Sequence, residues 1–288
     1  MRPISILEPL KKCLTKIFTQ RLDNTITQYK LLSNLNFAAT KNTSTHIPIQ
    51  ILHNTIEHYK LHKKEAWIFF QDMSKAFDRI NISRLQDTCK RIGIPPQSVN
   101  FITELHTQRQ AQIITAFGLT SPVHIRSGIE QGETYSPLLW KIYYDPILSF
   151  IYDKYQNSFL KIQTQSPLET ISQQQTIPIT IPPLAYMDDT TWHTENLQTM
   201  QEILNDTNNL YKLNNIEINP TKSDLLHIYP KSKKQQPNQQ LQYNNQTIKP
   251  RKQTEVIRYL GIFLDSYSSI QPIYKTIFNK IENFLSLT

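Results

Sequence analysis

Residues 184–192 have the sequence LAYMDDTTW, in which two adjacent carboxylates stand between short runs of apolar and β-branched residues. Such runs favour strands and an Asp-Asp pair suits a tight turn, so the segment predicts a β-hairpin with Asp188 and Asp189 at its tip. Successive strand residues point to opposite faces, so the two carboxylates cannot hold one ion in the same way. A metal site would need a third carboxylate, and the pair taken alone is more typical of a solvated turn.

A third carboxylate, Asp72, follows another predicted strand. Residues 67–70 form an apolar, aromatic run that is too short for a helix and typical of a buried strand. Phosphodiester synthesis uses two divalent ions about 3.5 to 4 Å apart, and Mg²⁺ prefers carboxylate oxygen. If the two strands pair, Asp72 and Asp188 converge where water and substrate can still enter.

Composition excludes several classes of protein. The chain has 288 residues, of which 39% are hydrophobic, and this fits one or two globular domains and not a disordered polypeptide. No apolar run approaches the roughly 18 residues of a membrane span, and the N-terminus lacks a signal-peptide pattern. Cys13 and Cys89 have no CxxC spacing and predict reduced thiols. We therefore expect an intracellular location, in the nucleus or cytoplasm, and no membrane partner.

The charge is positive and unevenly distributed. The formal net charge is +8, and residues 231–258 carry seven Lys or Arg against Glu255 alone. This excess favours a polyanionic partner such as nucleic acid, although the Lys- and Gln-rich residues 231–240 are equally typical of a solvated linker.

Apolar periodicity and capping signals predict the remaining elements. Helices are expected over most of 1–35, after 43–45, from a capping box of Ser83 and Gln86, around 99–105, and over 138–152, 197–211 and 273–285. Strands are expected within 111–125, 216–218, 224–229 and 256–264. The 138–152 helix is apolar nearly all round and belongs in the core, with a kink at Pro146. Residues 155–183 are rich in Gln, Thr, Ser and Pro, which predicts an inserted loop.

Several motifs occur in the order and spacing of a reverse transcriptase, and almost the whole chain resembles the reverse transcriptases of non-LTR retrotransposons. Residues 70–78, FQDMSKAFD, resemble the first catalytic motif, and residues 128–138, GIEQGETYSPL, resemble the motif that approaches the nascent base pair. The other matching segments are residues 2–22, similar to an N-terminal fingers motif, residues 219–223, NPTKS, similar to the motif with a catalytic lysine, and residues 259–261, similar to a primer-gripping hairpin.

The resemblance implies an α+β fold with the right-hand architecture of a polymerase. A palm with a small antiparallel sheet would carry the three aspartates, backed by the 138–152 and 195–211 helices, with helical fingers before it and the thumb largely absent. The implied division is fingers in 1–65, palm in 66–80, a fingers or palm insertion in 81–125, palm with the 155–183 loop in 126–265, and the start of a thumb or connector in 266–288.

The resemblance also implies RNA-directed DNA polymerase activity with two Mg²⁺ ions, or Mn²⁺ instead, acting on an RNA template, a DNA or RNA primer and dNTPs. Asp72, Asp188 and Asp189 would be metal ligands, with Asp72 and Asp188 the principal pair, and Lys222 would protonate the departing pyrophosphate. The aromatic ring of Phe77 would exclude a ribose 2′ hydroxyl. The residues expected to contact substrate are Phe77, Lys41, Gln131, Gly132 and Met187.

Three glycines and one position where arginine is expected bear on this implied activity. Gly128, Gly132 and Gly261 all fall in the motifs, as expected if backbone passes close to nucleic acid there. Residues 37–45, FAATKNTST, resemble a second fingers motif in which Thr40 stands at the usual arginine position, and Lys41 beside it could replace that cation.

Two alternatives to an active reverse transcriptase remain open. A catalytically degenerate fragment could keep the fold and bind RNA through its basic surface, which the Thr40 departure and the absent thumb favour. An RNA-dependent RNA polymerase would also present an Asp pair on a hairpin, although Phe77 argues against it.

Overall fold

The computed structural model describes residues 9–40, 43–107, 109–125, 127–165, 176–229, 239–252 and 255–265, together with 274, 277–279 and 281–282. At its centre lies a four-stranded antiparallel sheet with the strand order β10-β1-β9-β8. These strands are β1 Ala66–Gln71, β8 Leu184–Tyr186, β9 Asp189–Thr194 and β10 Asp224–Ile228. The fold is a mixed α+β fold with antiparallel sheets, as the sequence predicts.

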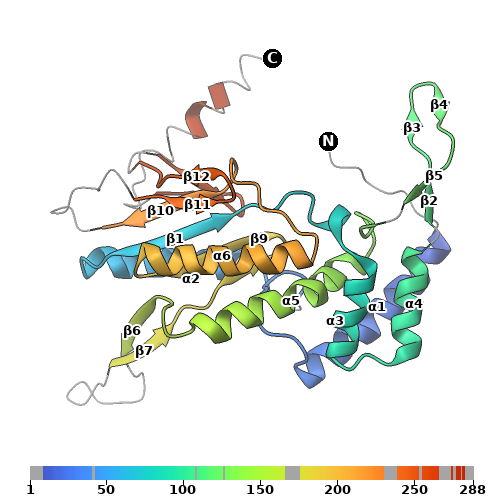
Figure 1. The fold of residues 1–288 in the computed structure, drawn as a ribbon, viewed down its shortest axis with the longest axis horizontal. Coiled ribbons are helices and arrows are strands. Elements are labelled where there is room, and N and C mark those ends of the chain that lie inside the picture. The colour runs from blue at the N-terminus through green and yellow to red at the C-terminus, as the bar shows by residue number, and fades with distance from the viewer. Residues whose placement is uncertain are drawn as a thin grey trace.

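Some helices lie along this sheet and others are grouped beyond its end, and small hairpins project from the molecule (Figure 1). The α-helices of the described part of the chain are α1 Pro9–Tyr29, α2 His46–Leu61, α3 Ile82–Arg91, α4 Pro96–His106, α5 Ser136–Tyr155 and α6 Leu197–Leu213. The hairpins pair β2 Arg109–Ala111 with β5 Val123–Ile125, β3 Ile114–Thr115 with β4 Gly118–Leu119, β6 Lys161–Gln165 with β7 Thr176–Thr180, β11 Leu241–Tyr243 with β12 Gln246–Ile248, and β13 Ile257–Tyr259 with β14 Ile262–Leu264.

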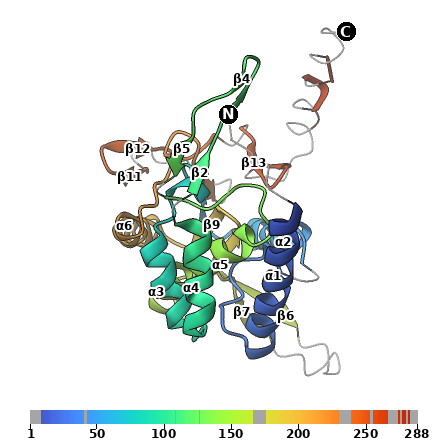
Figure 2. The same cartoon turned by 90° about the vertical axis from the view of Figure 1, so that its right-hand side faces the viewer.

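The central strand β1 is buried on both faces because each face of the sheet has its own core. Trp67 and Phe69 belong to one core, which α5 and α6 complete, whereas Ile68 and Phe70 belong to a second core, which includes residues of α2 and of the β13–β14 hairpin. This alternation is the period of two of a strand, and it explains why the run is apolar at every position. Figure 2 shows α6 and α2 on opposite sides of the sheet.

A buried polar network fixes the end of β1 against β9 and the two helices. Gln71, which is 3% exposed, donates from Nε2 to the Tyr211 hydroxyl at 2.7 Å and accepts from Trp192 Nε1 at 3.1 Å. The Tyr144 hydroxyl lies 2.7 Å from the Tyr211 hydroxyl and 3.1 Å from Thr190 Oγ1. A slip of one residue in the β1–β9 register would leave the buried amide unpaired, so the network specifies the register.

Two predictions about local structure are wrong. The hairpin turn consists of Met187 and Asp188, because Asp189 already belongs to β9 and pairs with Tyr186. The N-cap of α3 is Asn81, whose side chain accepts from Arg84 N at 3.2 Å, and not Ser83. An asparagine side chain caps a helix as well as serine does, so the helix starts one residue before the predicted cap.

Other segments differ from the predictions in extent. The predicted loop 155–183 contains the β6–β7 hairpin, and residues 166–175 between its strands lie outside the described residues. The predicted strand 216–218 forms only a single bridge, from Ile218 to Met73, and the 256–264 segment is a hairpin that turns at Leu260 and Gly261. Of the predicted helix 273–285, the described residues are helical. None of the helices described is both long and apolar enough to cross a membrane.

Candidate active site

Asp72 directly follows β1, and the segment that contains Lys222 is hydrogen-bonded to it. The Asp72 amide donates to Ser223 Oγ at 3.1 Å, and the Asp72 carbonyl accepts from the Asn219 amide at 2.8 Å. Ser223 Oγ donates in turn to the Asn219 carbonyl at 2.9 Å. The 219–223 segment is thus closed on itself and fastened to the end of the strand, which carries Lys222 to Asp72.

The turn that presents Asp188 is fixed by two residues that sequence analysis missed. Met187 has a φ of 57°, a left-handed conformation that costs an ordinary side chain roughly 1 to 2 kcal/mol. Its carbonyl accepts from Trp140 Nε1 at 2.8 Å and from Asn36 Nδ2 at 3.2 Å, and its amide donates to Asn36 Oδ1 at 3.2 Å. Asn36 and Trp140 are far from Met187 in sequence, and neither carries a signal that could have identified it.

Most of the predicted site residues line one cavity of about 700 Å³. The two carboxylates Asp72 and Asp188 face it, and so does the exposed Lys222. The predicted residues in its wall are Asp72, Phe77, Gln131, Gly132, Asp188 and Lys222. They come from the end of β1, the short 3-10 helix η1 (Phe77–Arg79), the loop before α5, the hairpin turn and the 219–223 segment.

Three predicted site residues are not in this wall. The Met187 side chain packs against the core formed with α5, and Lys41 lies outside the described residues. Asp189 lies in β9 and not in the turn. Trp192 belongs to the core formed with α5 and α6, and Thr190 lies 3.1 Å from the Tyr144 hydroxyl of α5, so the alternation of β9 directs Asp189 to the other face of the sheet.

The structure therefore separates the two adjacent aspartates. Within the described residues, no group of three or more His, Cys, Asp or Glu side chains is arranged to hold a metal ion. Asp72 and Asp188 nevertheless offer hard carboxylate oxygens to one open cavity, which is the donor chemistry that Mg²⁺ prefers. The donor set fits a divalent cation through these two residues, and the third expected ligand, Asp189, does not line the cavity.

Phe77 contacts Trp140 through its ring and the loop before α5 through its backbone. Its ring centroid lies 5.7 Å from that of Trp140, and its carbonyl accepts from the Ile129 amide at 2.9 Å. Gly128 crosses this turn so closely that a Cβ atom on it would lie 2.7 Å from the Asp78 carbonyl oxygen and 2.8 Å from the Phe77 carbonyl oxygen. The missing side chain of Gly128 thus leaves room for the protein's own backbone, which corrects the expectation of room for nucleic acid.

Thr40, which stands at the arginine position of the fingers motif, receives a hydrogen bond from a buried lysine. Lys141 of α5 is 9% exposed, and its Nζ lies 2.5 Å from Thr40 Oγ1. Burial lowers the pKa of Lys141, whereas the nearby carboxylates Asp23 and Asp145 raise it. A cation is therefore already present at this loop, although it comes from another element than the motif.

The basic segment near the C-terminus is only partly described. Lys231, Lys233 and Lys234 lie outside the described residues. Arg251 is paired within the chain, because its Nε lies 2.6 Å from Asp224 Oδ1. Lys249, Lys252 and Arg258 are exposed and available to a polyanion.

Comparison with known protein families identifies the family of this chain. Residues 1–264 match the family model described as "Reverse transcriptase (RNA-dependent DNA polymerase)". The chain belongs to the reverse transcriptase family. The resemblance to reverse transcriptases of non-LTR retrotransposons is thereby confirmed, and the homology to them is distant.

The relatives that this reverse transcriptase domain matches are longer proteins. It is 23% identical to a Pol polyprotein from the type-1 retrotransposable element R2 of Popillia japonica, over 96% of this chain and 36% of that protein. It is 25% identical to a probable RNA-directed DNA polymerase from transposon BS of Drosophila melanogaster, over 49% of this chain and 16% of that protein. The chain thus spans well under two thirds of the relatives that it matches.

Solved structures support the fold. The apo telomerase of Candida tropicalis superposes with a TM-score of 0.54 at 11% identity, covering 89% of this chain and 40% of that one. The telomerase of Candida albicans, solved with a fragment of telomeric RNA, gives 0.51 at 13% identity, covering 96% and 43%. At such identities the likeness is one of fold alone.

Gly128→Ala should destabilise this reverse transcriptase domain much more than a matched substitution at Gly93. Both glycines have similar backbone angles, with φ of 80° and 77°, but only Gly128 has atoms within 4 Å of the added Cβ. Backbone strain should cost each variant about 1 kcal/mol, and the clash should cost Gly128→Ala about 1 to 3 kcal/mol more. Urea unfolding measures both losses, and equal losses would contradict the close approach.

Thr40→Arg, which introduces the arginine expected from the fingers motif, should destabilise the domain. The guanidinium would face the buried ammonium of Lys141, and like charges repel strongly away from water. We expect a loss of about 1 to 3 kcal/mol, most of which Lys141→Met should recover in the double variant. Thr40→Ser, which keeps the hydroxyl, is the control, and a neutral Thr40→Arg would show that the two positions are not coupled.

Proposed function

We propose that this domain is an RNA-directed DNA polymerase that adds dNTPs to the 3′ end of a primer annealed to an RNA template. The observation that supports this most is the convergence of Asp72, Asp188 and Lys222 on one cavity, from segments up to 150 residues apart. In this proposal the central sheet and its helices form the palm, and the N-terminal helices belong to the fingers. The domain boundaries expected from sequence remain part of the proposal.

Each residue of the cavity has a role in the proposed reaction. Asp72 and Asp188 are the residues that would hold divalent cations, which in phosphoryl transfer activate the attacking hydroxyl and neutralise the triphosphate. Lys222 would donate a proton to the departing pyrophosphate, and its exposure leaves the ammonium free to reach it. Gln131 and Gly132 would support the incoming base pair.

Asp72→Asn and Asp188→Asn should each abolish primer extension, whereas Asp189→Asn should leave measurable activity. The first two remove carboxylates that face the cavity, and the third removes one that does not line it. The assay uses an annealed RNA template and DNA primer with dNTPs and Mg²⁺, and losses of about 10³-fold or more are expected for the two ligands. Asp87→Asn, on the exposed surface of α3, is the control, and no extension by the wild type would sink the proposal.

The position of Phe77 favours dNTPs over rNTPs. Trp140 packs against its ring and the Gly128 backbone contacts the turn that carries it, so in this proposal the ring would resist displacement by a 2′ hydroxyl. Phe77→Val should raise the ratio of rNTP to dNTP incorporation by about tenfold or more. Preference of the wild type for rNTPs in the same assay would favour an RNA-dependent RNA polymerase instead.

A second candidate function is RNA binding without catalysis. It is favoured by the position of Asp189 outside the cavity wall and by the exposed Lys249, Lys252 and Arg258. Phosphate contacts of this kind weaken steeply with salt. Salt-sensitive RNA binding that survives Asp72→Ala, together with no extension at any Mg²⁺ or Mn²⁺ concentration, would identify this function.

A further inference from the structure

Two glutamates flank the pair Gln131–Gly132 in the cavity wall. The Glu133 side chain is fully buried and itself lines the cavity, and the Glu130 side chain is 11% exposed. Two carboxylates at this place would repel both each other and an incoming anion. The loop can therefore serve a triphosphate only if their charge is compensated.

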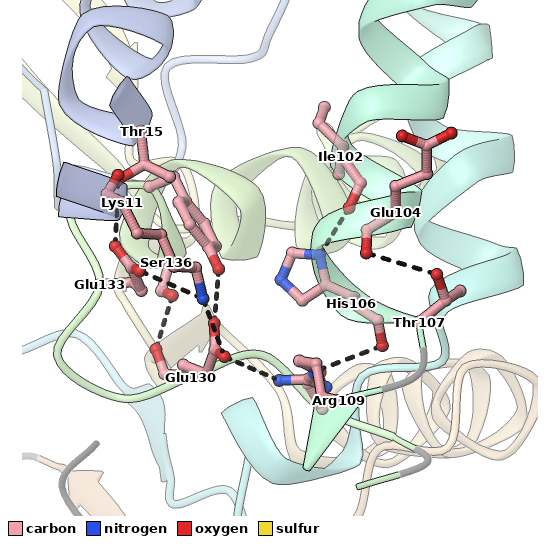
Figure 3. A network of polar contacts seen from close by, with 12 residues as sticks. Lys11, Thr15, Ile102, Glu104, His106, Thr107, Arg109, Glu130, Glu133 and Ser136 are labelled. Carbon is pink, nitrogen blue, oxygen red and sulfur yellow. Dashed lines mark hydrogen bonds and ion pairs between the residues drawn. The ribbon is translucent and has the colours of Figure 1, made fainter. Parts of the chain in front are cut away.

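A lysine from the first helix compensates both of them. Lys11 Nζ lies 3.3 Å from Glu130 Oε1 and 3.6 Å from Glu133 Oε1. Figure 3 shows Lys11 reaching Glu130 from α1 while Arg109, at the start of β2, approaches from the other side. Thr15, one turn beyond Lys11, donates to Glu133 Oε2 at 3.2 Å.

The two glutamates do not depend on Lys11 equally. Glu130 also accepts from the Tyr135 hydroxyl at 2.5 Å and has Arg109 at 3.7 Å. Burial alone would raise the pKa of Glu130, but the Tyr135 hydroxyl, Lys11 and Arg109 together lower it. Glu133 has Lys11 as its ion-pair partner, and its Oε1 has no hydrogen bond from the described residues. Loss of Lys11 would thus leave the negative charge of Glu133 uncompensated beside the cavity.

The rest of the loop is held rigidly. Arg109 Nη2 donates to the Gly128 carbonyl at 2.6 Å, and the Ser136 hydroxyl donates to the Glu130 carbonyl at 2.6 Å. These bonds do not involve Lys11. Its removal should therefore change the charge beside Gln131–Gly132 more than the course of the backbone.

We propose that Lys11 is a positioning residue of the nucleotide site, which neutralises Glu133 so that an anionic triphosphate can bind beside Gln131 and Gly132. The inference rests on the proposed polymerase function. It assigns to α1 an electrostatic part in nucleotide binding, carried out across the loop and without contact to the nucleotide itself.

The proposal predicts a selective loss of nucleotide affinity in Lys11→Met. The KM for dNTP should rise about tenfold with little change in kcat, because the charge acts on the bound ground state and transition state alike. Lys11→Arg should stay within about threefold of the wild type. The double variant Lys11→Met, Glu133→Gln should recover most of the affinity, because the uncompensated charge is gone. Lys16→Met, at an exposed lysine of the same helix, is the control.

A second measurement needs no turnover. With a dideoxy-terminated primer on the RNA template, the Kd of dTTP for the complex of protein, primer and template should rise about tenfold in Lys11→Met. It should return most of the way in the double variant. Equal falls in kcat and thermal stability without rescue by Glu133→Gln would show a merely structural lysine and overturn the inference. So would wild-type and Lys11→Met proteins that bind dTTP equally. A wild type that binds dTTP but extends no primer would contradict the proposed activity and leave this assignment standing.

Discussion

The antiparallel pairing of β1 with β9 is the constraint on which the site depends. It joins two segments more than a hundred residues apart, and only in the observed register does Gln71 meet both Trp192 and Tyr211. An unpaired buried amide costs about 1 to 3 kcal/mol, so a slipped pairing is penalised before any contact at the cavity is counted. The same register brings the end of β1, and with it Asp72, beside the turn that carries Asp188. Geometry at the cavity is thus secured by polar contacts beneath it.

Trp140 couples two parts of the site that sequence treats as separate motifs. Its indole nitrogen holds the carbonyl of Met187, and its ring packs against Phe77. One buried side chain of α5 therefore sets both the turn that presents Asp188 and the aromatic ring proposed to exclude ribose. The near-continuous apolar surface of α5 thus does more than fill the core, because the fully buried Trp140 contacts both Met187 and Phe77.

How far sequence could predict the site depends on the range of the interaction. Strand β1, the long apolar helix and the cavity-lining Asp72, Phe77, Gln131, Asp188 and Lys222 followed from local patterns and from motif order. The observed turn, Met187–Asp188, lies one residue before the predicted one. Local propensity favours Asp over Met at positive φ, but the tertiary hydrogen bonds of Asn36 and Trp140 override that preference. Gly128 was recognised but misinterpreted, because its close neighbour, the Phe77–Asp78 backbone, is fifty residues away. Lys11 and Lys141 could not be predicted, since their partners are set by the packing of α1 and α5 against loops.

The displaced turn changes what the adjacent aspartates can do. With Met187 and Asp188 at the tip, Asp188 is free of strand pairing and can turn its carboxylate to the cavity that Asp72 also faces. Asp189 is a strand residue whose direction the β8–β9 pairing dictates. Burial raises the pKa of Tyr259, in the core that includes the β13–β14 hairpin, and the charge of Asp189 adds to this rise. Because the alternation of a strand cannot be relaxed at one residue without moving the next, the pair is inherently unequal. In the proposed reaction an ion at this site would draw on Asp72 and Asp188 first. Lys222 would meet the triphosphate from the cavity wall, and Lys11 would act on it only through Glu133.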